Sequence, residues 1–166
     1  MNNSFIGVLK YAYVREEEGK NFYKSRMNDL KNEQSREIFE MLTEMESDHM
    51  NTIKELILNI ENEEPFQFDH LKEAENIFEK RELKEIVGGE VNNLTSDLSI
   101  VRMAYLIEED FVKFYEDAAS KTKDENLKEI LITLAKWEKS HRDMLNNHYR
   151  DLSKLYWSEM GFEPLF

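Results

Sequence analysis

The chain has 166 residues, a length typical of a single domain. Aspartate and glutamate number 35 against 22 lysines and arginines, so the formal net charge is −13. Such an acidic chain does not suit nucleic acids or anionic membranes, which both bind basic surfaces. The sequence contains no cysteine, which excludes disulfides, thiolate nucleophiles and cysteine-ligated zinc or iron–sulfur sites within it.

The composition favours amphipathic helices over a large mixed α/β core. Apolar residues make up only 40% of the chain and charged residues 34%, which matches helices with one apolar stripe and one solvated face. No apolar run reaches the length of a membrane span. The first residues also lack the charged and apolar regions of a signal peptide. We therefore expect a cytoplasmic protein with no membrane contact.

Four long stretches place apolar residues at helical period, and strand patterns are absent. The predicted helices cover about residues 4–29, 33–61, 97–121 and 125–149. A crossover over 62–96 contains Pro65 and a predicted short helix near 70–86, and a C-terminal tail covers 150–166. This order predicts one all-α domain over 1–166, a four-helix bundle of two antiparallel hairpins joined by a long crossover.

The two predicted hairpins repeat each other in sequence. When Glu16–His49 is aligned with Glu108–His141, 11 of the 34 positions are identical. Asn32 and Asp124, both good helix N-caps, occupy the same position of the repeat. The chain is therefore expected to contain two helical hairpins of common design.

Each half of the repeat contains one Glu-x-x-His motif. The motifs are Glu46-Ser47-Asp48-His49 and Glu138-Lys139-Ser140-His141. Residues at i and i+3 share a helix face, so both side chains of a motif can reach one metal ion. This spacing alone is a weak signal, because glutamate is frequent in the sequence and chance matches are common.

The register of the helices makes the signal stronger. The otherwise apolar stripe of each predicted helix contains one glutamate, and these are Glu16, Glu46, Glu108 and Glu138. In an antiparallel hairpin, residues equidistant from the turn face each other, and each hairpin has its two glutamates equidistant from its turn. We therefore expect four carboxylates and two imidazoles to meet in one layer of the bundle.

The charge of this layer predicts what it binds. Four buried, ionised carboxylates are very costly without compensation, and two divalent cations match their charge. Oxygen ligands with one imidazole per ion suit iron or manganese more than structural zinc. We predict two iron ions, with manganese or a mixed pair as the alternative, and Glu46 and Glu138 as bridges. The predicted metal ligands are Glu16, Glu46, His49, Glu108, Glu138 and His141.

The residues that carry these motifs resemble the ferritin-like di-iron carboxylate proteins, most closely their rubrerythrin-like branch. The matching segments are Glu16–Tyr23 with Glu46-x-x-His49 and Glu108–Tyr115 with Glu138-x-x-His141. The resemblance covers roughly residues 4–149 and implies a ferritin-like bundle with an oxygen- or peroxide-reactive di-iron centre. Glu16 and Glu108, which are not predicted to bridge, are the outer glutamates. The resemblance also implies that Tyr23 and Tyr115, each seven residues after an outer glutamate, donate hydrogen bonds beside the metals.

The chain departs from this resemblance at two points. Typical rubrerythrins carry a cysteine-rich rubredoxin domain that delivers electrons, whereas this sequence contains no cysteine. We therefore expect electrons to come from a separate donor protein. Phe111 stands where those proteins carry a further glutamate, which leaves a more symmetric set of six ligands, closer to a bacterioferritin ferroxidase centre.

The predicted activity is oxidation of the di-ferrous centre by peroxide or dioxygen. A ferroxidase is a close alternative, and a dimanganese catalase is less favoured. The alternative from another class is a non-catalytic metal-binding helical bundle or interaction module. We expect a homodimer, because two-fold homodimers are the commonest soluble oligomers.

Several residues near the predicted site have more than one interpretation. Gly19, one turn after Glu16, either serves helix packing or leaves room beside the metals. His148 is interpreted as a partly buried or surface residue rather than a third imidazole ligand. Trp137 and the aromatic residues of the tail are interpreted as packing or interface residues.

Overall fold

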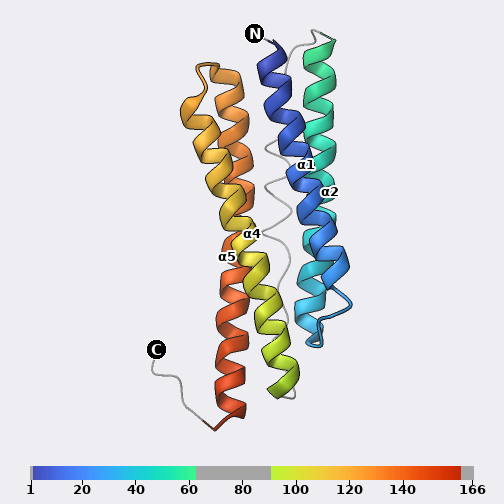
Figure 1. Cartoon of the computed structure of the whole chain (residues 1–166), viewed down its shortest axis with the longest axis vertical. Helices are drawn as coiled ribbons and strands as arrows, with labels where there is room; N and C mark the ends of the chain where they lie inside the picture. Colours follow the sequence, from blue (N-terminus) through green and yellow to red (C-terminus); the bar gives the residue numbers. More distant parts are fainter. Residues whose placement is uncertain (1, 63–90, 162–166) are drawn as a thin grey trace.

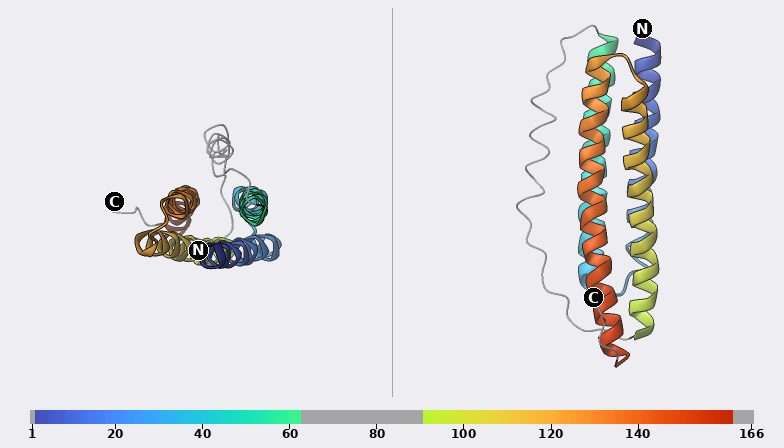
Figure 2. Two further views of the ribbon diagram at one scale, coloured as in Figure 1. Left: turned by 90° about the horizontal axis from the view of Figure 1, so that it is seen from above. Right: turned by 90° about the vertical axis from the view of Figure 1, so that its left-hand side faces the viewer.

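The computed structural model of the protein describes residues 2–62 and 91–161. These residues form four α-helices and no strand: α1 (Asn2–Arg26), α2 (Glu33–Glu61), α4 (Val91–Lys121) and α5 (Glu125–Glu159). Figure 1 shows two antiparallel hairpins, α1 with α2 and α4 with α5, standing side by side. Seen from above, α1 and α4 form one layer, and α2 and α5 lie behind them (Figure 2). The predicted all-α bundle is confirmed.

The helix boundaries differ from the prediction at several ends. α2 matches it, but α1 ends at Arg26 and α4 begins at Val91. α5 continues to Glu159, so much of the segment predicted as a tail is helix. Leu152, which is fully buried in this extension, continues the apolar stripe of α5 and explains why the helix does not end earlier. The predicted short helix near 70–86 lies outside the described residues.

Side-chain caps start the second helix of each hairpin. The side chain of Asn32 accepts a hydrogen bond from the backbone N–H of Ser35 at 3.0 Å. The carboxylate of Asp124 accepts from the backbone N–H groups of Asn126 and Leu127, both at 3.1 Å. Such caps satisfy backbone donors that the first helical turn leaves without partners. Because the caps are equivalent in the repeat, α2 and α5 bring their Glu-x-x-His motifs to equivalent positions.

The core consists of two apolar clusters with a polar layer between them. The cluster toward the α4–α5 turn includes Leu9, Ile53, Leu56, Leu127 and Leu131. The cluster toward the α1–α2 turn includes Leu30, Phe39, Leu42, Val101 and Leu145. The predicted metal ligands lie between these two groups along every helix. The apolar clusters hold the bundle together and separate the polar layer from water at both ends.

Two buried polar contacts join the hairpins near the α1–α2 turn. The carboxylate of Asp97 on α4 accepts the backbone N–H groups of Lys31, at 2.9 Å, and Asn32, at 2.6 Å. On α5, the Nε2 atom of His148 lies 2.8 Å from the hydroxyl of Ser35 on α2. His148 is therefore a buried structural residue, seven positions beyond His141, and not a third imidazole in the metal-ligand layer.

None of the described helices is both long and apolar enough to cross a bilayer.

The burial of His148 predicts a pH-dependent stability. Burial lowers the pKa of His148 from 6.5 to about 4, although Asp151 opposes the change. Protonation therefore favours the unfolded chain, so stability should be complete above about pH 6.5 and fall progressively down to about pH 4. The loss attributable to this group is roughly 3 kcal/mol. Urea unfolding of the metal-free protein across this range measures it.

Replacing His148 with glutamine provides the comparison, because glutamine can hydrogen-bond Ser35 but does not titrate. The difference between the wild-type and H148Q unfolding free energies should shrink as the pH falls. A difference that stays constant from pH 7 to pH 4 would show that His148 does not carry this dependence.

Candidate metal centre

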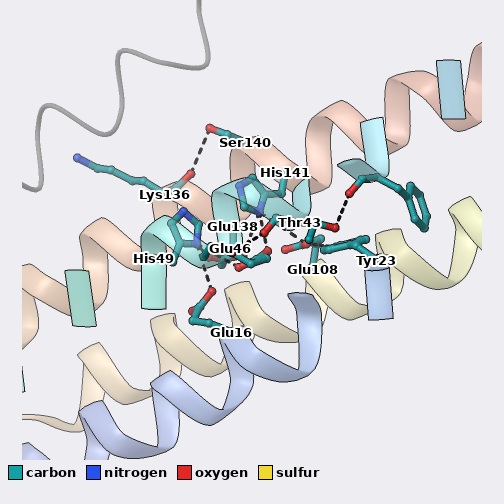
Figure 3. Close-up of polar contacts among 12 residues, drawn as sticks. Glu16, Tyr23, Thr43, Glu46, His49, Glu108, Lys136, Glu138, Ser140 and His141 are labelled. Carbon is teal, nitrogen blue, oxygen red and sulfur yellow. Dashed lines mark hydrogen bonds and ion pairs between the residues drawn. The ribbon is translucent and has the colours of Figure 1, made fainter. Parts of the chain in front are cut away.

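All six predicted ligands lie together in the polar layer between the apolar clusters. They are Glu16 on α1, Glu46 and His49 on α2, Glu108 on α4, and Glu138 and His141 on α5. Their exposed fractions lie between 0% and 3%. Figure 3 shows the carboxylates converging from all four helices below the two imidazoles. The structure thus brings together every residue that the register placed in this layer.

The imidazole of His49 faces three carboxylates from three different helices. Its Nδ1 atom lies 3.2 Å from Glu16 Oε2 and 3.2 Å from Glu46 Oε2. The same atom lies 3.3 Å from Glu138 Oε1. One nitrogen and three oxygens therefore form a compact group at this end of the layer.

His141 forms the corresponding group at the other end. Its Nδ1 atom lies 3.2 Å from Glu46 Oε1 and 3.4 Å from Glu138 Oε2. The Oε1 atom of Glu108 follows at 3.6 Å. Glu46 and Glu138 thus each turn one oxygen toward His49 and the other toward His141, which is the arrangement expected of two bridging carboxylates. One ligand atom from each of Glu46, His49, Glu138 and His141 lies within 4.8 Å of the other three, so this group could hold metal ions.

The central carboxylates lack ordinary hydrogen-bond partners. Both oxygens of Glu46 and of Glu138, and Oε2 of Glu108, are buried without a hydrogen bond from any residue within 2–62 and 91–161. Buried carboxylate oxygens in this state are costly, and native structures usually satisfy them. A cation between Glu46 and Glu138 would remove this cost, so the donor set fits metal ions chemically.

Two tyrosines connect the hairpins across the centre. The hydroxyl of Tyr23 on α1 donates a hydrogen bond to Glu108 on α4, and the hydroxyl of Tyr115 on α4 donates to Glu16 on α1. Burial, and then the nearby carboxylates, raise the pKa of both tyrosines well above the usual value, so both remain protonated donors. Each outer carboxylate is therefore oriented by the opposite hairpin, a crossing that the sequence did not reveal.

The protonation of the layer reflects its excess negative charge. Burial, followed by repulsion from Glu138, raises the pKa of both outer carboxyls, Glu16 and Glu108, well above the usual range. Burial opposes protonation of the imidazoles, but the surrounding carboxylates outweigh it and raise the pKa of His49 and His141. Without metal, protons on the outer carboxyls and the imidazoles therefore offset the negative charge of the layer. Metal binding would release these protons.

Trp137 is a contributor to the site that sequence reasoning missed. Its indole ring stacks on His49, with ring centroids 4.5 Å apart and planes at 17°. The His49 ring in turn stacks on His141 at 5.0 Å and 6°. Trp137 precedes Glu138 directly, but the imidazole that it contacts lies on another helix, so the pattern of α5 alone gave no signal of this role.

The family of the chain can now be stated from comparison with known proteins. The family model described as rubrerythrin matches residues 7–149. The chain belongs to the rubrerythrin family. This membership and the buried glutamate–histidine cluster together fit a di-iron site.

A solved structure shares the fold of this rubrerythrin-family chain. It is a hypothetical protein from Pyrococcus furiosus, with 22% identity over 90% of each chain and a TM-score of 0.61. No curated protein gives a significant match.

The crossed tyrosines predict a defined loss when they are truncated. In the Tyr23→Phe, Tyr115→Phe double variant, both outer glutamates lose the donors that orient them, and metal affinity should fall about 10- to 100-fold. Titration of the metal-free protein with Mn²⁺ measures this change. Tyr105→Phe is the matched control, because that hydroxyl bonds Glu109 at 2.8 Å outside the centre. Equal affinities of the double variant and the control would contradict the orienting role.

Proposed function

We propose that the protein is a di-iron oxidoreductase whose reduced centre is oxidised by peroxide or dioxygen, with electrons arriving from a separate donor protein. The single observation that carries the proposal is the division of the central carboxylates. Glu46 and Glu138 each offer one oxygen to the His49 end and one to the His141 end. Membership of the rubrerythrin family supports iron as the metal.

The residues of the chain would have different roles in binding the metal ions and orienting their ligands. Glu46 and Glu138 would hold both ions, while each imidazole and each outer glutamate would bind one of them. Bound iron would supply redox chemistry and Lewis acidity. Tyr23 and Tyr115 fix the outer carboxylates and keep a proton on each hydroxyl. The apolar clusters on both sides exclude bulk water from the layer.

A ferroxidase is the second candidate, and one observation favours it. Phe111 is 2% exposed and apolar, so this position supplies no further carboxylate to the centre. A set of six ligands, with one histidine and one outer glutamate at each end, suits a centre that oxidises iron(II) and passes it on. In that case iron is the substrate, and the protein would release oxidised iron after turnover.

Anaerobic mixing experiments test the proposal. The iron-loaded, reduced protein should be oxidised rapidly by hydrogen peroxide, by dioxygen or by both, as followed by stopped-flow absorption. Iron retained after oxidation supports the oxidoreductase, whereas iron released to a ferric chelator supports the ferroxidase. Inertness toward both oxidants would refute both candidates and leave a metal-binding module.

Matched variants connect this reactivity to the centre. In the Glu46→Ala, Glu138→Ala double variant, neither carboxylate spans the two ends, so binding of two irons and rapid oxidation should both be lost. Glu44→Ala removes an exposed glutamate from the same helix and should retain two irons and the wild-type rate. Retention of both irons by the double variant would show that these residues do not bridge.

A further inference from the structure

The internal repeat is broken beside the metal centre by a glycine and a phenylalanine. Gly19 and Phe111 are equivalent in the repeat, and each lies one turn after an outer glutamate. Both are buried. A Cβ atom added to Gly19 would lie 3.1 Å from Phe111 Cε2 and 3.7 Å from the carboxylate carbon of Glu46. The Phe111 ring, the Gly19 backbone and the Glu46 carboxylate therefore meet at one point.

This contact explains the choice of residues at the two positions. The ring of Phe111 fits against α1 because position 19 has no side chain, and a methyl group there would force the ring to move by a few tenths of an ångström. The ring consequently packs on the α1–α4 side of the centre, directly beside a central carboxylate. Of the two interpretations of Gly19, the geometry favours helix packing, because the side chain that a Cβ atom would crowd is the Phe111 ring of α4.

Arg15 covers the outer side of the same ring. Its guanidinium carbon lies 4.5 Å from the centroid of Phe111, a cation–π distance. The Arg15 side chain is 25% exposed. It lines an open surface hollow next to α4 whose other charged residues are Lys113, Asp110, Glu116 and Asp117. The Phe111 ring thus contacts a partly exposed guanidinium and also lies near the carboxylate of Glu46.

Arg15 also offers a donor at this position. Its Nε atom is buried and has no hydrogen-bond partner within the described ranges. Its Nη1 atom pairs with Glu18 Oε2 at 3.6 Å, so Nε is the N–H group that could donate to a small polar oxidant such as hydrogen peroxide. Arg15, Phe111 and Gly19 therefore form a series of contacts that leads from the surface hollow toward the Glu46 carboxylate.

We propose that Phe111, seated on Gly19 and covered by Arg15, is the gate that selects the oxidant by size. Small displacements of the ring admit hydrogen peroxide or dioxygen and exclude organic hydroperoxides. Phe111 is thus a specificity-determining residue. This inference rests on the proposed oxidation of the centre, because it names the class of oxidant for that same site.

The test compares two oxidants in single turnovers. Hydrogen peroxide and tert-butyl hydroperoxide are each mixed with reduced, iron-loaded wild type, Phe111→Ala and Phe111→Leu. The wild type should discriminate strongly against the organic peroxide, and F111A should reduce this discrimination by about tenfold or more. F111L, which keeps most of the bulk, should lie between the two and substitutes for F111A if the larger truncation does not fold.

A ligand-binding measurement gives a readout that needs no turnover. Iron-loaded protein is oxidised with ferricyanide and mixed with azide, a small anion whose binding to ferric iron changes the absorption spectrum. Azide should bind faster to F111A than to the wild type. Leu106→Ala is the control, because this apolar side chain of the same helix is 47% exposed, and it should leave both measurements unchanged.

The outcomes separate this inference from the function on which it rests. Wild-type iron that reacts with neither hydrogen peroxide nor dioxygen refutes the proposed function, whatever the azide rates. A reactive wild type whose peroxide discrimination and azide rate equal those of F111A and F111L refutes the gate alone.

Discussion

Four glutamate carboxylates share one buried layer, and the rest of the molecule is arranged around the charge that this creates. Ionised carboxylates at this depth repel one another and lack the solvation that water provides. The protonated tyrosines donate hydrogen bonds to Glu16 and Glu108, and the protonated imidazoles offset part of the charge. The division of the apolar core into two clusters also follows from it, because the layer interrupts the apolar stripe of every helix. Two divalent cations would match the charge of the four ionised carboxylates.

The repeat gives the centre its two-fold character, and its exceptions make the two ends different. The crossed tyrosine contacts are equivalent, since each joins one hairpin to the outer glutamate of the other. Two pairs of equivalent positions break this symmetry: Gly19 faces Phe111, and Met45 is the counterpart of Trp137. Phe111 fills the space that Gly19 leaves, and Trp137 stacks on His49. The side chains next to the centre therefore differ between the two halves of the repeat, which is a physical basis for selective access.

The sequence predicted the elements that depend on local chemistry and register. Asn32 and Asp124 cap the second helices, and the glutamates equidistant from each turn meet in one layer. Contacts between helices were not predictable in the same way. The crossing of Tyr23 to Glu108 and the stacking of Trp137 on His49 depend on how the hairpins pack, which a one-dimensional pattern does not encode. The predicted tail is helical as far as Glu159, because Leu152 continues the helical period and is buried against the bundle.

Anomalous diffraction from crystals of the iron-loaded protein, collected at the iron absorption edge, tests the central claim most directly. Two iron peaks are expected, one beside His49 with Glu16 and one beside His141 with Glu108. Glu46 and Glu138 should contact both. A single peak, or full folding with no iron peak in this layer after anaerobic loading, would contradict the claim that paired cations neutralise the buried carboxylates.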